Sequence, residues 1–289
     1  MAKKKTKKKI TKVIKNDDKD FLYENAPLVE VIFEVFWKIH KIEALDGAFI
    51  DPKYADLTKS FSNEISKKGY TYIEHLVPSE IPIEYLGKTP HIRFRQEKDK
   101  WPLYQIGPGI FTANNTPPYK GWNEMRKNIF DGLDVLYHSY PLANDLLLPE
   151  KISLRYIDGF TASHGMKNIN DFISNYINID LNIGNELVDN FIDDSNKIMP
   201  HAEFRFPIKN TQKNLLLKLA PGKSKNENAL ILEMNISSTM DESSNINKAK
   251  IKKWADDSHE ILRTFFQQLL SYELKEKLGP KKYIKGIDK

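Results

Sequence analysis

Cysteine is missing from all 289 residues of the chain. Disulfides, thiolate metal sites and cysteine nucleophiles are therefore excluded, and the absence is compatible with a reducing cytosol. Long apolar runs are missing too, because the longest one, APLVEVIFEVFW, is short and is interrupted by Glu30 and Glu34. The basic amino terminus is not followed by the apolar segment of a signal peptide. We therefore expect a cytoplasmic protein with no membrane span.

The common catalytic and cofactor-binding motifs are also absent. The chain has neither of the glycine-rich phosphate-binding patterns, GxxxxGK[ST] and GxGxxG, and it has no HExxH or GxSxG. Its seven histidines form no pair at the i, i+2 or i, i+4 spacing of metal ligands. We therefore expect no cofactor and no metal, and the sequence favours a protein that is not an enzyme.

Positive charge is concentrated at the amino terminus. The formal net charge is +5, and residues 1–20 contribute nine lysines and three aspartates, or +6, which leaves −1 for the rest. Such a segment cannot bury enough apolar surface to fold, so we expect a disordered tail. Either the tail only keeps the protein in solution, or it attracts nucleic acid, an anionic lipid surface or an acidic partner. Binding to nucleic acid would lack sequence specificity, since the tail has no arginine or aromatic residue. The lysines of the second interpretation are Lys3, Lys4, Lys5, Lys7, Lys8 and Lys9.

The remaining sequence predicts an α+β protein in which the order β-α-β-β-β-α occurs twice. The first unit, 21–148, has an alternating strand at 28–37, a helix from about 51 to 68, strands at 70–76, 91–97 and 101–115, and a helix at about 121–140. The second unit, 149–289, has strands at 151–160, 201–208, 214–220 and 229–237, and helices at 166–177 and about 245–278. Residues 180–199 read as a loop or short helix. We expect antiparallel sheets, each packed by a long helix, and the pattern leaves open whether they join edge to edge.

Charged side chains of both signs recur at every second position of the predicted strands. This pattern is typical of a solvated ladder of cross-strand ion pairs. The alternative is a recognition face, on which arginines bind a carboxylate, a phosphate or a base. The candidate residues for a ligand or partner face are Glu30, Glu34, Arg93, Arg95, Arg155 and Arg205.

The segment QIGPGIFTANNTPPY contains a second candidate. Gly107 and Gly109 flank a proline that cannot donate to a sheet ladder, which predicts a kink in one long strand. Asn114, Asn115 and Thr116 suit turns and helix caps, and an anion could be held where the next helix begins. We prefer the interpretation in which these residues only shape the backbone.

A third candidate lies in the segment WADDSHEILR. Asp256, His259, Glu260 and Arg263 share one face of the predicted helix. A carboxylate that orients the imidazole would make a catalytic pair. The preferred interpretation is a solvated polar face opposite an apolar stripe that includes Trp254, Ile261, Phe265 and Tyr272.

Four segments together resemble a sporadically distributed, uncharacterised bacterial family. They are NAPLVEVIFEV, PLYQIGPGIFTANNTPPYKGW, RYID and WADDSHEILRTFFQQLLSYELKEKLG. The likeness covers most of residues 25–279, and the lysine tail lies outside it. The resemblance implies no established reaction and no catalytic residue. Patchy distribution is common among accessory proteins of mobile elements and anti-phage systems, which is an association and not a mechanism.

Three hypotheses for the function follow. The leading one is a non-enzymatic binding or assembly protein that recognises a protein partner or forms a homo-oligomer. The second is a nucleic-acid-associated protein that uses the lysine tail and the arginines of the sheet face. The third is a hydrolase or transferase whose site is assembled from dispersed polar residues such as Glu30, Arg93 and Arg155.

Overall fold

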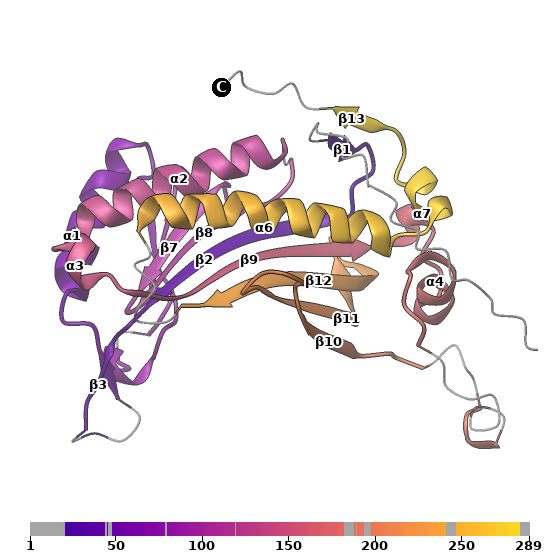
Figure 1. Cartoon of the computed structure of the whole chain (residues 1–289), viewed down its shortest axis with the longest axis horizontal. Helices are drawn as coiled ribbons and strands as arrows, with labels where there is room; N and C mark the ends of the chain where they lie inside the picture. Colours follow the sequence, from indigo (N-terminus) through magenta and orange to yellow (C-terminus); the bar gives the residue numbers. More distant parts are fainter. Residues whose placement is uncertain are drawn as a thin grey trace, which may run out of the picture.

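The computed structural model describes residues 21–283 except 44, 46–47, 79, 119, 182–187, 189, 194–197 and 241–246. The lysine tail and much of the predicted insertion at 180–199 lie outside the described residues. The architecture is α+β, as the sequence predicts, with long helices packed on one face of a broad sheet (Figure 1).

The main sheet has nine strands in the order β10-β11-β12-β9-β2-β8-β7-β6-β5, and every neighbouring pair is antiparallel. Pairing of β2 with β9 makes one continuous sheet from the two halves of the chain. The strands are β2 (Leu28–Trp37), β5 (Tyr72–His75), β6 (Ile92–Arg95), β7 (Leu103–Gly107), β8 (Ile110–Asn115), β9 (Pro149–Phe160), β10 (Ala202–Pro207), β11 (Asn214–Ser224) and β12 (Glu227–Thr239).

The two halves repeat one topology outward from the centre of the sheet. In the first half β2 is followed outward by β8, β7, β6 and β5, and in the second half β9 is followed by β12, β11 and β10. Each half therefore places its first strand at the centre and its last strand next to it. The repeat of element order in the sequence corresponds to a repeat in space.

Three long helices cover one face of this sheet: α1 (Tyr54–Lys67), α2 (Trp122–Ser139) and α6 (Lys248–Leu269) (Figure 1). Alternation in β2 directs Val31, Phe33 and Val35 toward the helices, and all three are fully buried. Helix α6 buries a stripe at helical spacing that includes Ile251 and Leu262. The core lies between the sheet and these helices.

Smaller elements complete the described chain. They are β1 (Phe21–Tyr23), which pairs with β13 (Lys281–Tyr283), the hairpin of β3 (His40–Lys41) and β4 (Phe49–Ile50), the helices α3 (Ala143–Leu146), α4 (Ile169–Tyr176) and α7 (Tyr272–Lys277), and the 3-10 helices η1 (Ile83–Tyr85) and η2 (Ala162–His164). Over the described ranges, no helix combines the length and apolarity needed to cross a membrane.

The prediction of one long kinked strand at 101–115 is wrong. The chain turns back on itself, because Gly107 pairs with Ile110 and the hairpin loop is Pro108-Gly109. Gly109 has φ 70°, which the third residue of a type II turn requires. A Cβ atom on Gly107 would lie 1.9 Å from the carbonyl oxygen of Thr89. Within the main sheet, the first half consequently has one strand more than the predicted β-α-β-β-β-α order.

The prediction of one helix from about 245 to 278 is also wrong. Helix α6 ends at Leu269, Leu270 is extended with φ −86° and ψ 138°, and α7 begins at Tyr272. The Ser271 side chain accepts a hydrogen bond from the Leu274 backbone N–H and so caps α7. Tyr272, which the sequence places on the apolar stripe, is 72% exposed because the break turns it outward.

Candidate functional site

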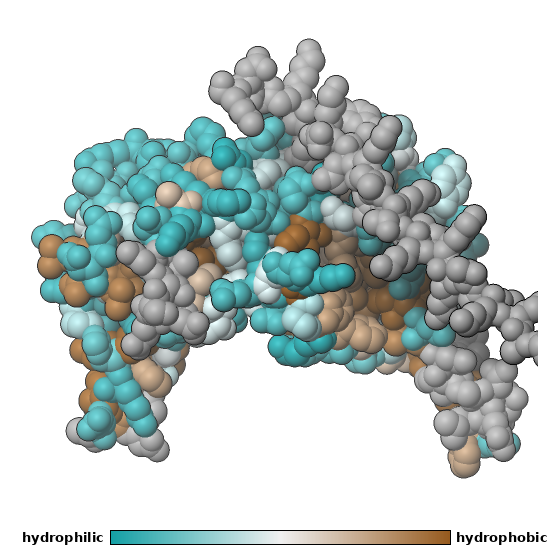
Figure 2. Space-filling model, viewed as in Figure 1, coloured by the Kyte–Doolittle hydropathy of each residue, from teal (hydrophilic) through white to brown (hydrophobic). Residues whose placement is uncertain are grey.

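The face of the sheet opposite α1, α2 and α6, which we call the open face, carries all of the predicted face residues. They alternate with residues that point toward the helices, so strand period places them together on this side. In Figure 2 the underside of the molecule is hollowed beneath the sheet. The residues placed here are Glu30, Glu34, Arg93, Arg95, Arg155 and Arg205.

The centre of the open face is a cross-strand ion-pair ladder. The Glu34 Oε2 atom accepts hydrogen bonds from Ser153 Oγ at 2.6 Å and from Arg155 Nη2 at 3.2 Å. Arg155 Nε also lies 3.5 Å from Glu233 Oε1 on β12. Three neighbouring strands are therefore joined by side chains as well as by their backbones.

The outer arginines of the open face are paired in the same way. Arg93 and Arg95 share Glu74, at 3.6 Å and 2.8 Å. Arg205 donates from Nε to Glu203 Oε1 at 2.7 Å. Each predicted arginine thus has a glutamate partner. The open face has the features of a ladder of cross-strand ion pairs, which is one of the two interpretations of the sequence pattern.

The structure does not bring Glu30, Arg93 and Arg155 together as a catalytic group. Strand β6 carries Arg93 and strand β9 carries Arg155, with β7, β8 and β2 between them. Four strand spacings of about 4.8 Å separate them by roughly 19 Å. The hydrolase or transferase hypothesis therefore has no assembled site at these three residues.

The predicted loop residues separate to opposite ends of a hairpin. Gly107 and Gly109 form its turn, whereas Asn114 and Asn115 end strand β8. Asn114 donates to Glu30 Oε1 at 2.9 Å, and Asn115 Oδ1 accepts from the Thr116 backbone N–H at 2.9 Å. None of them caps α2, because its N-cap residue is Gly121. These contacts lie within the backbone and the sheet.

Exposed apolar residues border the hollow. The β3–β4 hairpin projects beyond the sheet on the side of the open face, and η1 contacts β4 (Figure 1). Figure 2 shows hydrophobic side chains along this projection. We call this group the apolar tip; its members, each at least 36% exposed, are Leu45, Phe49, Ile50, Ile81, Ile83 and Tyr85. Contiguous exposed apolar surface is typical of an interaction site.

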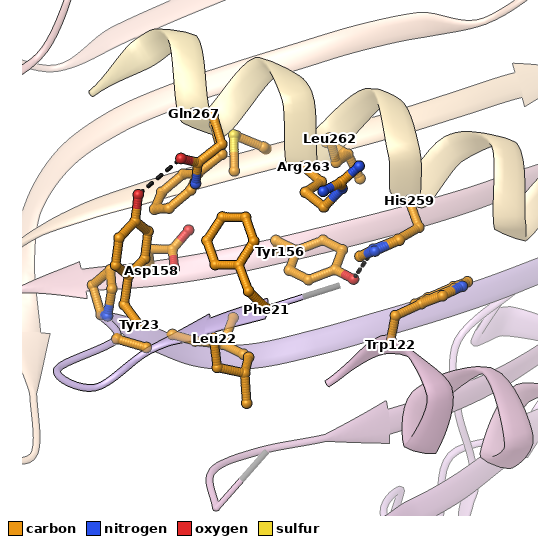
Figure 3. Close-up of a pocket in the computed structure, with 15 residues that line it drawn as sticks. Phe21, Leu22, Tyr23, Trp122, Tyr156, Asp158, His259, Leu262, Arg263 and Gln267 are labelled. Carbon is orange, nitrogen blue, oxygen red and sulfur yellow. Dashed lines mark hydrogen bonds between the residues drawn. The ribbon is translucent and has the colours of Figure 1, made fainter. Parts of the chain in front are cut away.

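A pocket lies on the other side of the sheet, beneath α6 (Figure 3). It has a volume of about 100 Å³, and its walls come from β1, the following segment, the first residue of β2, β9, β12, α6 and the first residue of α2. Apolar and aromatic side chains form most of the lining. The charged or strongly polar side chains among them are Asp158, His259, Arg263 and Gln267.

Asp158 is the unusual member of this lining. It is 4% exposed, and no described residue hydrogen-bonds to its carboxyl group. Its neighbours across the two adjacent strands are Leu28 and Leu232. Burial raises the pKa of Asp158 from 3.8 to about 7, because the apolar surroundings disfavour the charged form. Asp158 is absent from our sequence-based candidates.

His259 is buried against the sheet, so the sequence-based placement on a solvated face is wrong. Its ring stacks on Trp122 with centroids 4.3 Å apart, and its Nδ1 atom lies 2.8 Å from the Tyr156 hydroxyl (Figure 3). Burial, together with the charge of Arg263, lowers its pKa to about 3. Asp256 accepts from Trp122 Nε1 at 3.0 Å. The Asp256 carboxylate therefore binds the Trp122 indole and does not orient the His259 ring, so the predicted catalytic pair is not formed.

Comparison with protein-family models, curated proteins and solved structures gives no match for this chain. The family resemblance stays a prediction. Among the residues that the structure describes, no three metal-ligating side chains of histidine, cysteine, aspartate or glutamate gather into one group.

Proposed function

We propose that the chain is a binding protein that recognises a protein partner through its hollow side. The apolar tip carries this proposal, since six large apolar side chains are exposed together beside the open face. Phe49 and Ile50 are 36% and 41% exposed, so burying the part that remains exposed contributes about 0.5–1.2 kcal/mol for each residue. Apolar side chains next to polar ones are the usual composition of a protein–protein interface.

The ion pairs of the open face favour a protein over a nucleic acid as the partner. Arginines bind phosphate strongly when their guanidinium groups are available. On the open face the arginines already pair with glutamates, as Arg155 does with Glu34 and Arg205 with Glu203. An apolar tip has no counterpart in a phosphate backbone, whereas it suits an apolar surface of a folded partner.

Affinity purification of the tagged full-length chain from its native host, with nuclease present, tests this proposal. The wild type is compared with a tip variant, Phe49→Ser with Tyr85→Ser, and with a matched control, Leu142→Ser with Tyr272→Ser. The control residues are 69% and 72% exposed and lie outside the apolar tip. Both double variants replace two exposed apolar residues by serine, and the control residues are the more exposed pair.

We expect a stoichiometric protein complex that survives nuclease, is retained by the control and is lost in the tip variant. Light scattering then gives the mass of the complex and shows whether the partner is a second copy of the chain. A complex that survives in the tip variant, or a chain that elutes as a bare monomer, would contradict the proposal. Nucleic acid that co-elutes and disappears with nuclease would favour the lysine-tail hypothesis instead.

A further inference from the structure

Two buried aspartates in this protein have opposite surroundings. Asp51 is 6% exposed and accepts hydrogen bonds from Trp37 Nε1 at 2.9 Å, from the Tyr140 hydroxyl at 3.0 Å and from the Lys53 backbone N–H at 3.0 Å. Asp158 is 4% exposed and receives no hydrogen bond from any described residue. A buried carboxyl group without a partner is unfavourable for folding. The packing of the fold explains Asp51 but does not explain Asp158.

The other polar groups of the pocket already have partners. The Tyr23 hydroxyl donates to Gln267 Oε1 at 2.8 Å, which fixes both side chains at the pocket wall (Figure 3). The hydroxyl of Tyr156 shares its hydrogen bond with His259. These groups are directed at one another, whereas no described residue hydrogen-bonds to the Asp158 carboxyl group, which faces the pocket.

Neither of the basic side chains that line the pocket with Asp158 supplies a counter-charge to its carboxylate. Arg263 also lines the pocket, but its Nη2 atom lies 2.7 Å from Glu260 Oε2. His259 stays neutral at physiological pH because its pKa is about 3. Burial raises the pKa of Asp158, and no cation among the described residues lowers it. A bound cation would supply the missing counter-charge.

The size and walls of the pocket narrow the kind of cation. A volume of about 100 Å³ is small beside the roughly 300–1,000 Å³ of typical metabolite sites. It suits a chain of a few atoms. Aromatic rings of Phe21, Tyr23, Tyr156 and Phe266 line it, and such rings attract cations through their faces and also pack on aliphatic stems.

We propose that this pocket binds an alkylammonium group, with the ammonium paired to the Asp158 carboxylate and a short aliphatic stem among the aromatic rings. A free short amine and a lysine side chain present this same chemistry. The pocket lies across the sheet from the open face, so this site is independent of the proposed partner surface.

Ligand-detected NMR titration of the full-length chain at pH 8 with n-butylamine and with 1-butanol as the neutral analogue tests the site. At that pH the amine is protonated, and Asp158, with a pKa of about 7, is mostly ionised. We expect at least tenfold tighter binding of the amine than of the alcohol. Asp158→Asn should abolish this preference.

A variant of the same chain distinguishes the two sources of the ammonium group, a free amine and the chain's own lysines. Residues 1–20 hold nine lysines, so the titration is repeated on a full-length variant in which all nine are glutamine. Amine binding that is measurable only in this variant identifies the chain's own lysines as the occupant, and equal binding in both proteins identifies an external amine. Failure of the amine to bind either protein, equal affinity for amine and alcohol, or a preference that survives Asp158→Asn would overturn the proposal.

Discussion

Asp158→Asn should stabilise the folded protein, and the gain should grow with pH. The folded-state pKa of Asp158 is raised from 3.8 to about 7, so between these values the folded chain holds a proton that the unfolded chain has released. The stability that Asp158 contributes is therefore complete below pH 3.8 and is lost as the pH rises toward 7. About three pH units at 1.36 kcal/mol each give a loss of about 4 kcal/mol by pH 8. Asparagine does not ionise and escapes this loss.

Urea denaturation of the wild type and of Asp158→Asn at pH 5 and pH 8 measures the effect. Two pH units separate pH 5 from the folded-state pKa of about 7, and above that pKa the loss is complete. The difference in the free energy of unfolding between the two proteins should therefore shift by about 2.7 kcal/mol in favour of asparagine between pH 5 and pH 8. Groups that titrate equally in both proteins cancel in this difference. A variant that is less stable than the wild type at pH 8, or a difference that does not change with pH, would refute the reasoning.

Asp51→Asn is the matched control for this measurement. Asp51 accepts three hydrogen bonds, and two of the donors, Trp37 and Tyr140, are themselves buried. In asparagine one of the two accepting oxygens is replaced by an NH₂ group, which is a donor and would face the N–H or O–H donors that now bind Asp51. We expect a loss of about 1–3 kcal/mol in the free energy of unfolding at both pH values, opposite in sign to the change at Asp158.

Three further substitutions test the packing and the ladder, each by urea denaturation. Gly132→Ala should destabilise by about 1–3 kcal/mol despite its better helix propensity, because its Cβ atom would lie 2.5 Å from Tyr104 Cε1; a more stable variant would show that this contact relaxes. Glu34→Gln should cost about 1–3 kcal/mol because Glu34 joins the central strands, whereas Glu203→Gln at the exposed edge should leave the stability essentially unchanged; equal effects would contradict the ladder. Trp122→Ala should cost about 3–5 kcal/mol because the indole is 7% exposed and stacked, and a loss below 1 kcal/mol would contradict that account of the helix interface.

The spacing of apolar residues predicts correctly which side of a strand is buried, whereas the turns and helix ends are predicted poorly. Alternation in residues 28–37 assigns Val31, Phe33 and Val35 to the buried side correctly, because strand geometry leaves no other choice. A Gly-Pro-Gly segment suits a bulge and a tight turn equally well, and only the pairing of Gly107 with Ile110 decides between them. The helical period continues past Leu269 in the sequence, so the cap at Ser271 is the one local sign of the break.

The candidate sites show the same division. Strand period places Arg155 on the open face, but its pairing with Glu34 depends on the register of β2 against β9, which one sequence does not reveal. The same period puts Asp158 on the buried side with Tyr156, which was a readable sign of an unusual carboxylate. Burial of His259 follows from its spacing of four from Ala255 and three from Leu262, both of which are buried on α6.

In-cell photo-crosslinking tests most directly whether the apolar tip contacts a partner. A photo-reactive amino acid is placed at Tyr85 in the tip and, in a separate protein, at Tyr272, which is exposed but outside it. We predict one discrete protein adduct from position 85 in native-host cells and none of the same mass from position 272. The same adducts from both positions, or no adduct from position 85, would contradict recognition of a protein partner through the hollow side.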